Sequence, residues 1–540
     1  MPMASTLHGS LANKLPSNVS CTHLDLGAVD WQSALTELKA MGATFLTVWG
    51  ADNCGRDNGY SIHAAFLTSA GVEVLSHRIE NVANPSYPSI APLFPAASRM
   101  ERATRDLLGI ASTGPDRQPD QRGWYRHNGW PANTYPLRHN NPHLEPRAPN
   151  PGPDNPYPFV QVEGDGVHEI AVGPVHAGTI EPGHFRFSVV GEKVLLLEER
   201  LGYTHKGVAR RFTELSQREG HRLAARLSGD SAVAFSWAYC AALESVTATP
   251  CPARATLLRA LALEHERIAN HLGDIGAIGN DAGFAFGLTQ FSRLKEDLLR
   301  TNRSVFGARY LMDYVLPGGV ATDLPDHAPS LLIETYSGIE EGVLAMRAIY
   351  GEHAGLRDRL SGTGTLERKV AERLGALGLS ARASGIAGDL RADHPWPPYH
   401  LLLQKLPGKA PLGPITYPDG DVAARVEVRF DETLQSLALC RLLLEELASA
   451  ALSSPQPQPV QATIPVAAPY RQGIGLIEGW RGPVMVALET GPDGSIRRCH
   501  THDPSWQNWP LLEYAILGNI VPDFPLINKS FNLSYSGQDG

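Results

Sequence analysis

Hydrophobic residues in the first 110 positions follow two periods, which predicts a small α+β domain. Apolar side chains recur every three to four positions over 30–41, so we expect a helix with Trp31, Leu35, Leu38 and Met41 on one face. Shorter β-branched and aromatic runs separated by turn residues predict strands over 43–50, 60–68 and 71–79. A second helix is expected over 97–109, with Gly109 as its C-terminal stop.

Proline dominates the next stretch, residues 131–159, of which roughly a third is proline. Such a composition favours an extended backbone and cannot hold a helix. We therefore expect a linker at 131–159 between an N-terminal domain, 1–130, and a larger domain, 160–540.

The larger domain changes from a strand pattern to a helical one near residue 206. Strands are expected over 168–175, 184–190 and 193–200, the last two joined as a hairpin at Gly191-Glu192. The helical period then predicts a bundle with helices over 207–225, 231–247, 253–278, 286–313, 326–354 and 431–453.

A small strand-rich part is expected near 473–500, with a turn at Asp493-Gly494, and the apolar tail 519–540 is expected to be docked. The predicted fold class is α+β. It has a small N-terminal α+β domain, a Pro-rich linker, a β-hairpin region, a large mostly α-helical bundle and a small sheet near the C-terminus.

Composition narrows the function classes. The 540 residues are 43% hydrophobic and carry a net charge of −9, which gives no basic footprint for nucleic acid. No apolar run is long enough for a transmembrane helix, and the first residues lack the apolar core of a secretory signal. We expect any membrane attachment to come through partners.

The six cysteines form no C-x-x-C pair, so local spacing predicts neither a zinc site nor an iron–sulfur site. So few cysteines in so long a chain also favour a reducing compartment over a disulfide scaffold. Dinucleotide, P-loop, G-x-S-x-G and H-E-x-x-H motifs do not occur in the sequence.

The block GPVHAGTIEPGHFRF, residues 173–187, is the most informative local motif. It brings His176, Glu181 and His184 together on a backbone that glycine and proline restrict, as a proton relay requires. The alternative is a hairpin whose histidines hydrogen-bond to the backbone.

A second group of titratable residues lies along the predicted bundle. Glu264, Arg267 and His271 are spaced to share one helical face, either as a proton path or as a structural salt-bridge ladder. Asp281, after a glycine-rich bend, is expected to close the same region, and His205 stands at a strand-to-helix transition.

Several segments together resemble one superfamily. GPVHAG…EPGHFRF, RLGYTHKG, EHERIANH, PGGVATDLP and YPDGDVAARVEVR are similar to the 49 kDa-type subunit of respiratory complex I and the large subunit of group 4 [NiFe]-hydrogenases. YPSIAPLFPAASRMERATRDLLGI and HNGWPANTYPLR resemble the 30 kDa-type subunit of complex I. The fused layout looks closest to the large subunits of hydrogenase-4 and formate hydrogenlyase.

The resemblance implies four metal-ligating cysteines in two pairs. In this sequence the corresponding positions are Ser228, Ser231, Ser534 and Gly537. Serine hydroxyls are hard, weakly acidic donors that do not replace thiolates at nickel or low-spin iron, so we expect no [NiFe] centre.

The resemblance to the quinone-binding subunit is also incomplete. The positions of its quinone-binding histidine and tyrosine fall at Ile180 and Gly229, and two further histidines fall at Leu311 and Met312. The matching residues are His176, Arg226 and Asp281.

The resemblance therefore implies a peripheral subunit on the cytoplasmic face of a bacterial-type membrane, in a complex related to NADH-quinone oxidoreductase. Its expected partners are a small subunit with a [4Fe-4S] cluster and antiporter-like membrane subunits. The chain itself is expected to bind no cofactor, and a quinone or similar acceptor is expected at the partner interface. Electron transfer to that acceptor would be coupled to proton or ion translocation. The alternative is a non-catalytic docking subunit, and a remote alternative is a hydrogenase large subunit.

Candidate site residues fall into three sets by expected role. The expected catalytic residues are Glu181, His184 and Asp281; the acceptor pocket is His176, His205, Arg226 and Gly229; the proton path is Glu264, Arg267 and His271.

Overall fold

The computed structural model describes residues 13–114, 118–127, 130, 131, 133–139, 157–176, 180–405, 412–452 and 458–540. Most of the predicted linker lies outside these residues. The N-terminal and larger domains share one continuous hydrophobic core, with members from Cys21 to Tyr535. Among the described helices, none combines the length and the apolar character that a bilayer span requires. The α+β class predicted from the sequence is confirmed.

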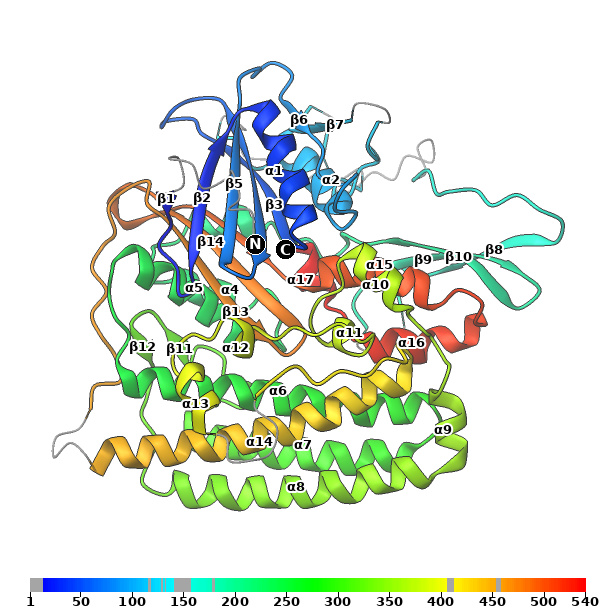
Figure 1. Cartoon of the computed structure of the whole chain (residues 1–540), viewed down its shortest axis with the longest axis vertical. Helices are drawn as coiled ribbons and strands as arrows, with labels where there is room; N and C mark the ends of the chain where they lie inside the picture. Colours follow the sequence, from blue (N-terminus) through cyan, green and yellow to red (C-terminus); the bar gives the residue numbers. More distant parts are fainter. Residues whose placement is uncertain are drawn as a thin grey trace, which may run out of the picture.

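A five-stranded sheet forms the N-terminal domain (Figure 1). Its order is β1 (Asn13–Lys14), β2 (Cys21–Leu26), β5 (Gly71–Ile79), β4 (Tyr60–Thr68) and β3 (Thr44–Asp52). Only the β2–β5 pair is parallel. The predicted helices are present as α1 (Ala28–Ala40) and α2 (Ala97–Leu108), and Gly109 closes α2 in the left-handed conformation at φ 73°. Two further short strands, β6 (Ser86–Pro88) and β7 (Ala111–Thr113), pair beside them.

An arm of three antiparallel strands extends to one side of the molecule (Figure 1). It consists of β8 (Val167–Val172), β9 (His184–Val190) and β10 (Lys193–Arg200). Lys193 pairs with Val190, so Gly191 and Glu192 form the predicted two-residue turn.

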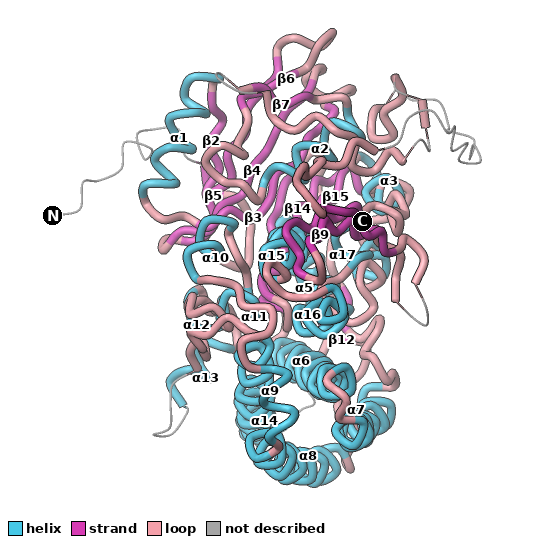
Figure 2. The backbone as a smooth tube through the Cα atoms, turned by 90° about the vertical axis from the view of Figure 1, so that its right-hand side faces the viewer, coloured by secondary structure: helices cyan, strands magenta, loops and turns pink. Residues whose placement is uncertain are grey.

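Four long helices form the bundle, seen nearly end-on in Figure 2. They are α6 (Ala253–Asp281), α7 (Ala285–Phe306), α8 (Ala328–Glu352) and α14 (Val422–Leu452). The short helices between α8 and α14 are α9 (Ala354–Leu360), α10 (Arg368–Leu374), α11 (Gly378–Arg382), α12 (Leu390–Asp393) and α13 (Tyr399–Lys405). A two-strand ladder, β11 (Val315–Leu316) and β12 (Gly319–Val320), precedes α8.

The predicted C-terminal sheet consists of β13 (Gln472–Gly479), β14 (Gly482–Thr490) and β15 (Ile496–His502). A short 3-10 turn over Pro492–Gly494 joins β14 to β15. Helix α5 (Ala232–Val246) packs on this sheet so closely that a Cβ at Gly475 would lie 1.8 Å from the Ala238 carbonyl oxygen. The tail is docked as predicted, through α15 (Ser505–Ala515), a 3-10 turn (Val521–Asp523), α16 (Phe524–Phe531) and α17 (Tyr535–Asp539).

Three predicted helix boundaries are wrong. The helix expected over 207–225 is two short helices, α3 (Val208–Phe212) and α4 (Gly220–Ala224), because residues 213–219 turn toward the C-terminal sheet, where the Gln217 N–H donates to the Gly494 carbonyl. Helix α7 ends at Phe306, since Gly307 adopts the left-handed conformation. Helix α14 begins nine residues before the predicted start, where the Asp421 carboxylate accepts the Ala424 N–H.

Candidate functional site

The four positions that correspond to the metal ligands come together at the meeting point of two helix N-termini. Ser231 is the N-cap of α5, and Ser534 is the N-cap of α17. The hydroxyl oxygens of Ser228 and Ser534 lie 2.8 Å apart, although 306 positions separate them in the sequence. The Gly537 N–H donates to the Ser534 Oγ at 2.9 Å. We call this group, Ser228, Ser231, Ser534 and Gly537, the cradle.

Charged oxygen and nitrogen groups fill the space between the cradle residues. The Arg481 guanidinium makes two hydrogen bonds to the Asp230 carboxylate, at 2.8 and 2.5 Å. Ser228 donates to the same carboxylate at 2.7 Å. On the other side, a Cβ at Gly537 would lie 2.5 Å from Asp503 Oδ2, so the Asp503 carboxylate occupies the place that a side chain at this position would need.

This donor set does not fit a nickel–iron centre. The cradle offers hydroxyl oxygens that already bond to each other or to Asp230, whereas nickel and low-spin iron require several soft thiolates. Within the described ranges, histidine, cysteine, aspartate and glutamate form no group of three or more suited to a metal ion.

The pKa values of the two carboxylates at the cradle are shifted in opposite directions. Burial alone would raise the pKa of Asp230, but the Arg481 charge and its hydrogen bonds outweigh burial and lower that pKa to about 2. Burial raises the pKa of Asp503, which Arg481 only partly offsets. Asp230 is therefore a fixed negative charge, while Asp503 holds its proton more readily than an ordinary aspartate.

Of the titratable residues in the 173–187 block, Glu181 contacts α17 beside the cradle, and the two histidines contact the backbone. The Ser536 N–H donates to Glu181 Oε2 at 3.2 Å, so this exposed carboxylate lies beside the first turn of α17. His176 hydrogen-bonds to the Gly183 carbonyl at 2.8 Å, and His184 to the Gly173 carbonyl at 3.1 Å. Both histidines thus make the backbone contacts of the alternative interpretation, and burial lowers the pKa of His184.

The residues predicted for an acceptor pocket do not converge in the described structure. Arg226 forms an exposed bidentate pair with Asp313, at 2.6 and 2.7 Å. Gly229 is exposed beside the cradle residue Ser228, and His205 lies at the contact between the two domains. His176 remains on the hairpin.

The predicted row on α6 is real and fully buried. The Glu264 carboxylate accepts hydrogen bonds from Arg391, from the Tyr399 hydroxyl at 2.6 Å and from the Ser436 hydroxyl at 2.6 Å. Burial would raise the pKa of Glu264, but the Arg391 and Arg267 charges reverse that effect and lower it.

Glu432 continues this network. Its carboxylate accepts a hydrogen bond from Arg267 at 3.3 Å, bonds to His271 at 2.9 Å and pairs with Arg382 at 2.7 Å. Arg382 also pairs with Glu478 at 3.2 Å. Burial raises the pKa of Glu478 to about 7, with the Asp389 charge adding to the effect.

A separate polar connection leads from α6 to the cradle. The Asn532 side chain donates to the Asp274 carboxylate at 2.7 Å, and its backbone carbonyl accepts from Arg481 Nε at 2.6 Å. Arg481 in turn holds Asp230. The same Asp274 carboxylate pairs with Arg429 at 3.0 Å. Helix α6 therefore supplies charged groups to both the buried network and the cradle.

Asp281 lies apart from this network. It is the exposed last residue of α6, so it stands about 25 Å along the helix axis from Glu264. The predicted glycine-rich bend before it is wrong, because α6 is continuous through Gly276 and Gly279. A Cβ at Gly279 would lie 2.2 Å from the Tyr350 hydroxyl, so this glycine serves close helix packing.

The sequence interpretation missed most of the charged residues around the cradle and network. Asp230, Arg481 and Asp503 carry no local motif that marks them as partners. Arg391 and Glu478 come from a short helix and a strand without any polar pattern of their own. Only the α6 row had a helical spacing that indicated one face.

Comparisons with known proteins agree over both domains. Residues 24–147 match the family described as respiratory-chain NADH dehydrogenase, 30 Kd subunit, and residues 281–539 match the 49 Kd subunit family. The chain is 30% identical over 503 residues to "Formate hydrogenlyase subunit 5" of Escherichia coli (strain K12), covering 92% of this chain and 85% of the relative.

A second relative is an NADH-quinone oxidoreductase C/D protein of Phocaeicola vulgatus, 27% identical over 435 residues, with 78% of this chain and 80% of the relative covered. Among solved structures, a chain in the "membrane-bound sulfane sulfur reductase (MBS), an archaeal respiratory membrane complex" matches with a TM-score of 0.62 at 23% identity. That match covers 69% of this chain and 98% of the other chain, and it shows a common fold.

Proposed function

This chain belongs to the respiratory-chain NADH dehydrogenase 49 kDa subunit family, with a 30 kDa-type domain fused before it, and we propose that it is the peripheral subunit of a membrane-bound oxidoreductase complex. In this proposal a partner subunit with a [4Fe-4S] cluster delivers electrons. A quinone or similar acceptor is reduced at the interface with that partner. The chain couples this reduction to ion movement through antiporter-like membrane subunits, from the cytoplasmic face.

The observation that carries the proposal is the cradle itself. A relay of hydroxyls and carboxylates has the chemistry of proton transfer, whereas metal–hydride chemistry needs the missing thiolates. Ser534 and Ser228 form a hydrogen-bonded series, with contacts of 2.8 and 2.7 Å, that ends on the fixed charge of Asp230 and is oriented by it. Asp503, which holds its proton more readily, is the cradle carboxylate suited to proton exchange. Glu181 lies one hydrogen bond from the same α17 turn. Reduction of a quinone takes up protons together with electrons, so a carboxylate beside the acceptor has a defined task.

The buried network around Glu264 supports the proposal that this chain couples reduction of the acceptor to ion movement. Isolated buried charges cost several kcal/mol, and a chain keeps them only when they are paired with good geometry. Here the side chains of Glu264, Arg267 and Arg391 are 0% exposed, and both arginines pair with the Glu264 carboxylate. A change of charge at one end of such a network shifts the protonation preference of its neighbours, because the surrounding dielectric is low.

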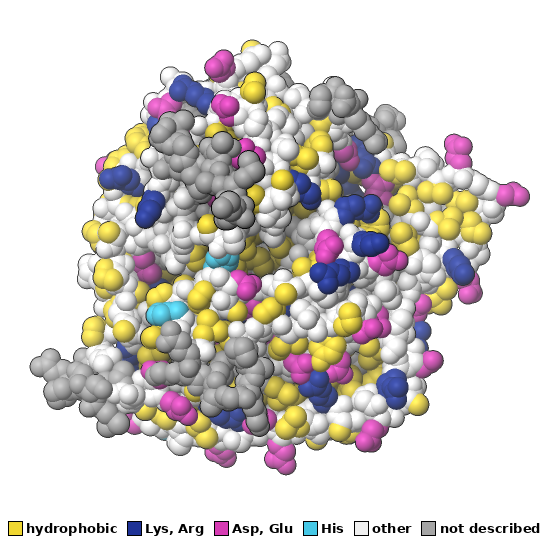
Figure 3. Space-filling view, viewed as in Figure 1, with side chains coloured by type: hydrophobic (Ala, Val, Ile, Leu, Met, Phe, Trp, Pro, Cys, Tyr) yellow, Lys and Arg dark blue, Asp and Glu magenta, His cyan; other side chains and the backbone are white. Residues whose placement is uncertain are grey.

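The strand arm, β8 to β10, supports the proposal that this chain docks on other subunits. Apolar side chains gather on it in Figure 3, and Val190 of β9 and Leu195 of β10 are 40% and 46% exposed. An exposed apolar surface of this kind suits burial by another subunit. The same face of the N-terminal domain and the bundle shows acidic and basic side chains interspersed instead.

A non-catalytic docking subunit is the second candidate. It is favoured by the backbone hydrogen bonds of His176 and His184, which hold the hairpin without leaving both ring nitrogens free for chemistry.

A matched pair of variants in the intact complex separates the two functions. Glu181→Gln removes the carboxylate beside α17, and Glu169→Gln removes an exposed carboxylate on β8 of the same arm, where it pairs with Arg186 at 2.7 Å. We expect Glu181→Gln to lower quinone-reductase turnover at least tenfold in isolated membranes, while Glu169→Gln retains it. Equal turnover of both variants, with the complex assembled, would favour the docking role.

A further inference from the structure

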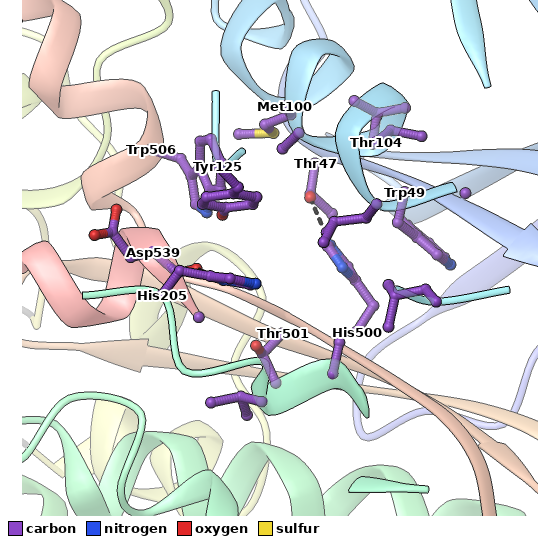
Figure 4. A pocket seen from close by; sticks show the side chains of 18 of the residues that line it. Thr47, Trp49, Met100, Thr104, Tyr125, His205, His500, Thr501, Trp506 and Asp539 are labelled. Carbon is purple, nitrogen blue, oxygen red and sulfur yellow. Dashed lines mark hydrogen bonds between the residues drawn. The ribbon is translucent and has the colours of Figure 1, made fainter. Parts of the chain in front are cut away.

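A cavity of about 110 Å³ lies at the contact between the two domains. The N-terminal domain contributes β3 and α2, and the larger domain contributes α3, β15 and α17. Apolar side chains make up most of its wall, among them Met100, Ala103, Leu107 and Val208. Figure 4 shows the open space between the side chains of the two domains.

His205 is the main polar group on one side of the cavity. Its Nδ1 bonds to the Asp539 backbone carbonyl at 2.8 Å, which requires the proton on Nδ1. In the neutral ring Nε2 is therefore a hydrogen-bond acceptor. The ring stacks on Tyr125, with centroids 4.3 Å apart and planes at 16°, and the Tyr125 hydroxyl donates to the Gln538 carbonyl at 3.0 Å. This wall is thus held rigidly.

The opposite side presents His500 and Thr47, whose side chains hydrogen-bond at 2.8 Å (Figure 4). His500 stacks on Trp49 at 5.0 Å between centroids. Burial lowers the pKa of His500 to about 3, so this ring is neutral as well.

The charged residues that touch the cavity are engaged elsewhere. The Asp539 carboxylate accepts from the Gly202 N–H at 2.9 Å and from the Thr204 hydroxyl at 2.6 Å, and Arg498 pairs with Glu489. The cavity therefore offers aromatic and apolar walls, with an acceptor nitrogen at His205.

We propose that this interdomain cavity is a binding site for a neutral, single-ring aromatic compound that carries one hydroxyl donor, that is, a phenol. An apolar cavity of about 150 Å³ accepts benzene, and this cavity of about 110 Å³ is somewhat smaller, so it has room for one ring at most. The ring packs against the apolar side chains of Met100, Leu107 and Val208, and its hydroxyl donates to His205 Nε2. The proposal goes beyond the proposed function, and its test needs no electron acceptor.

The cavity adjoins the cradle, so a ligand bound in the cavity acts on the position of the cradle. Gly537 both lines the cavity and belongs to the cradle, and α17 carries Ser534 at its start. A bound ring contacts the N-terminal domain and α17 at once, so it fixes the position of the cradle relative to β3.

Saturation-transfer NMR titrations of the full chain test the proposal, with phenol, toluene and cyclohexanol as probes. We expect saturable phenol binding and about tenfold weaker toluene binding because the hydrogen bond is missing. Cyclohexanol should also bind more weakly, because its puckered ring is thicker than the planar ring of phenol. Absence of saturable phenol binding at millimolar concentration overturns the proposal.

Two variants and a control assign the site. His205→Phe keeps a ring against Tyr125 but removes the acceptor, so it should bind phenol no better than toluene. Ala103→Leu fills the cavity and should abolish binding of all three probes. The control is His127→Phe, at a histidine that bonds to the Leu201 carbonyl at 2.7 Å outside the cavity wall, and it should bind phenol like the wild type. Unchanged phenol binding in either His205→Phe or Ala103→Leu places the ligand elsewhere and refutes the site.

Discussion

Replacing Glu264 with glutamine tests whether the buried network stabilises the bundle. The carboxylate is 0% exposed and is held by Arg391 at 2.9 Å, with further hydrogen bonds from Tyr399 and Ser436. Removing one partner of a buried ion pair costs about 3–5 kcal/mol. Glutamine keeps the shape and one acceptor oxygen, and Arg391 keeps its contact with Asp389 at 2.7 Å. We therefore expect a loss near the lower limit, about 3 kcal/mol.

Hydrogen exchange followed by mass spectrometry measures this loss locally, in peptides of α6 and α14. Since 1.4 kcal/mol is a factor of ten, the amide protons of α6 should exchange about 100-fold faster in Glu264→Gln. Glu296→Gln is the control, because Glu296 is a surface residue of α7 that pairs with Arg300 and Arg309. A change below about 1 kcal/mol in Glu264→Gln would refute the idea that this pairing stabilises the bundle.

The stability difference between wild type and Glu264→Gln should depend on pH in a defined direction. The pKa of Glu264 in the folded protein is lowered from its ordinary value of 4.5, because Arg391 and Arg267 outweigh burial. Such a group stabilises the fold fully above the unfolded pKa and loses this contribution as the pH falls through the folded pKa. The difference between wild type and Glu264→Gln should be constant near pH 7 and should shrink only below about pH 4.5.

Three further changes have defined outcomes. Gly537→Ala forces a Cβ to within 2.5 Å of Asp503 Oδ2, so thermal unfolding should show a loss of about 1–3 kcal/mol, and an unchanged melting temperature would contradict the packing of the cradle. Burial raises the pKa of Glu266 to about 8, so its stabilising contribution is complete below pH 4.5 and is lost as the pH rises through 8. In urea titrations between pH 6 and 9, Glu266→Gln should therefore lose less stability than wild type. Parallel curves for the two proteins would contradict this. Arg226→Ala removes an exposed pair with Asp313 and should change the unfolding free energy by less than about 1 kcal/mol, so a larger loss in the same titrations would show that the pair is not a surface contact.

The hydrophobic period predicted the fold best where the buried side chains are apolar. It located α1 and α5, and turn chemistry gave the hairpin at Gly191-Glu192. It also located α6, where apolar residues such as Leu261, Ile268 and Leu272 are buried beside the charged row. It failed at the start of α14, because Arg425 and Arg429 point into the protein there and are 0% exposed. Buried arginines at the first turns of a helix remove the apolar residues that would mark its start in the sequence.

The same limit applies to the site. Spacing along one helix showed that Glu264, Arg267 and His271 share a face, but their partners lie far away in the sequence: Arg391 is 127 positions from Glu264, and Glu432 is 161 positions from His271. No local pattern contains such pairings. The roles expected for Glu181, His184 and Asp281 remain predictions, and the separate location of Asp281 places it outside the hydrogen-bonded groups described around α6.

Exchanging the oxygen groups of the cradle for thiolates would change more than the ligand atoms. Four buried cysteines without a metal would be neutral thiols, which are weak hydrogen-bond donors, whereas hydroxyls at Ser228 and Ser534 satisfy each other at 2.8 Å. The remaining space is taken by the Asp503 carboxylate and by the Arg481–Asp230 pair, which anchors to the Asn532 carbonyl. These groups hydrogen-bond to one another, so replacing one cradle residue by cysteine would leave the other three positions surrounded by oxygen atoms. The cradle is therefore a polar junction between α5, α17 and the residues that lead to α6.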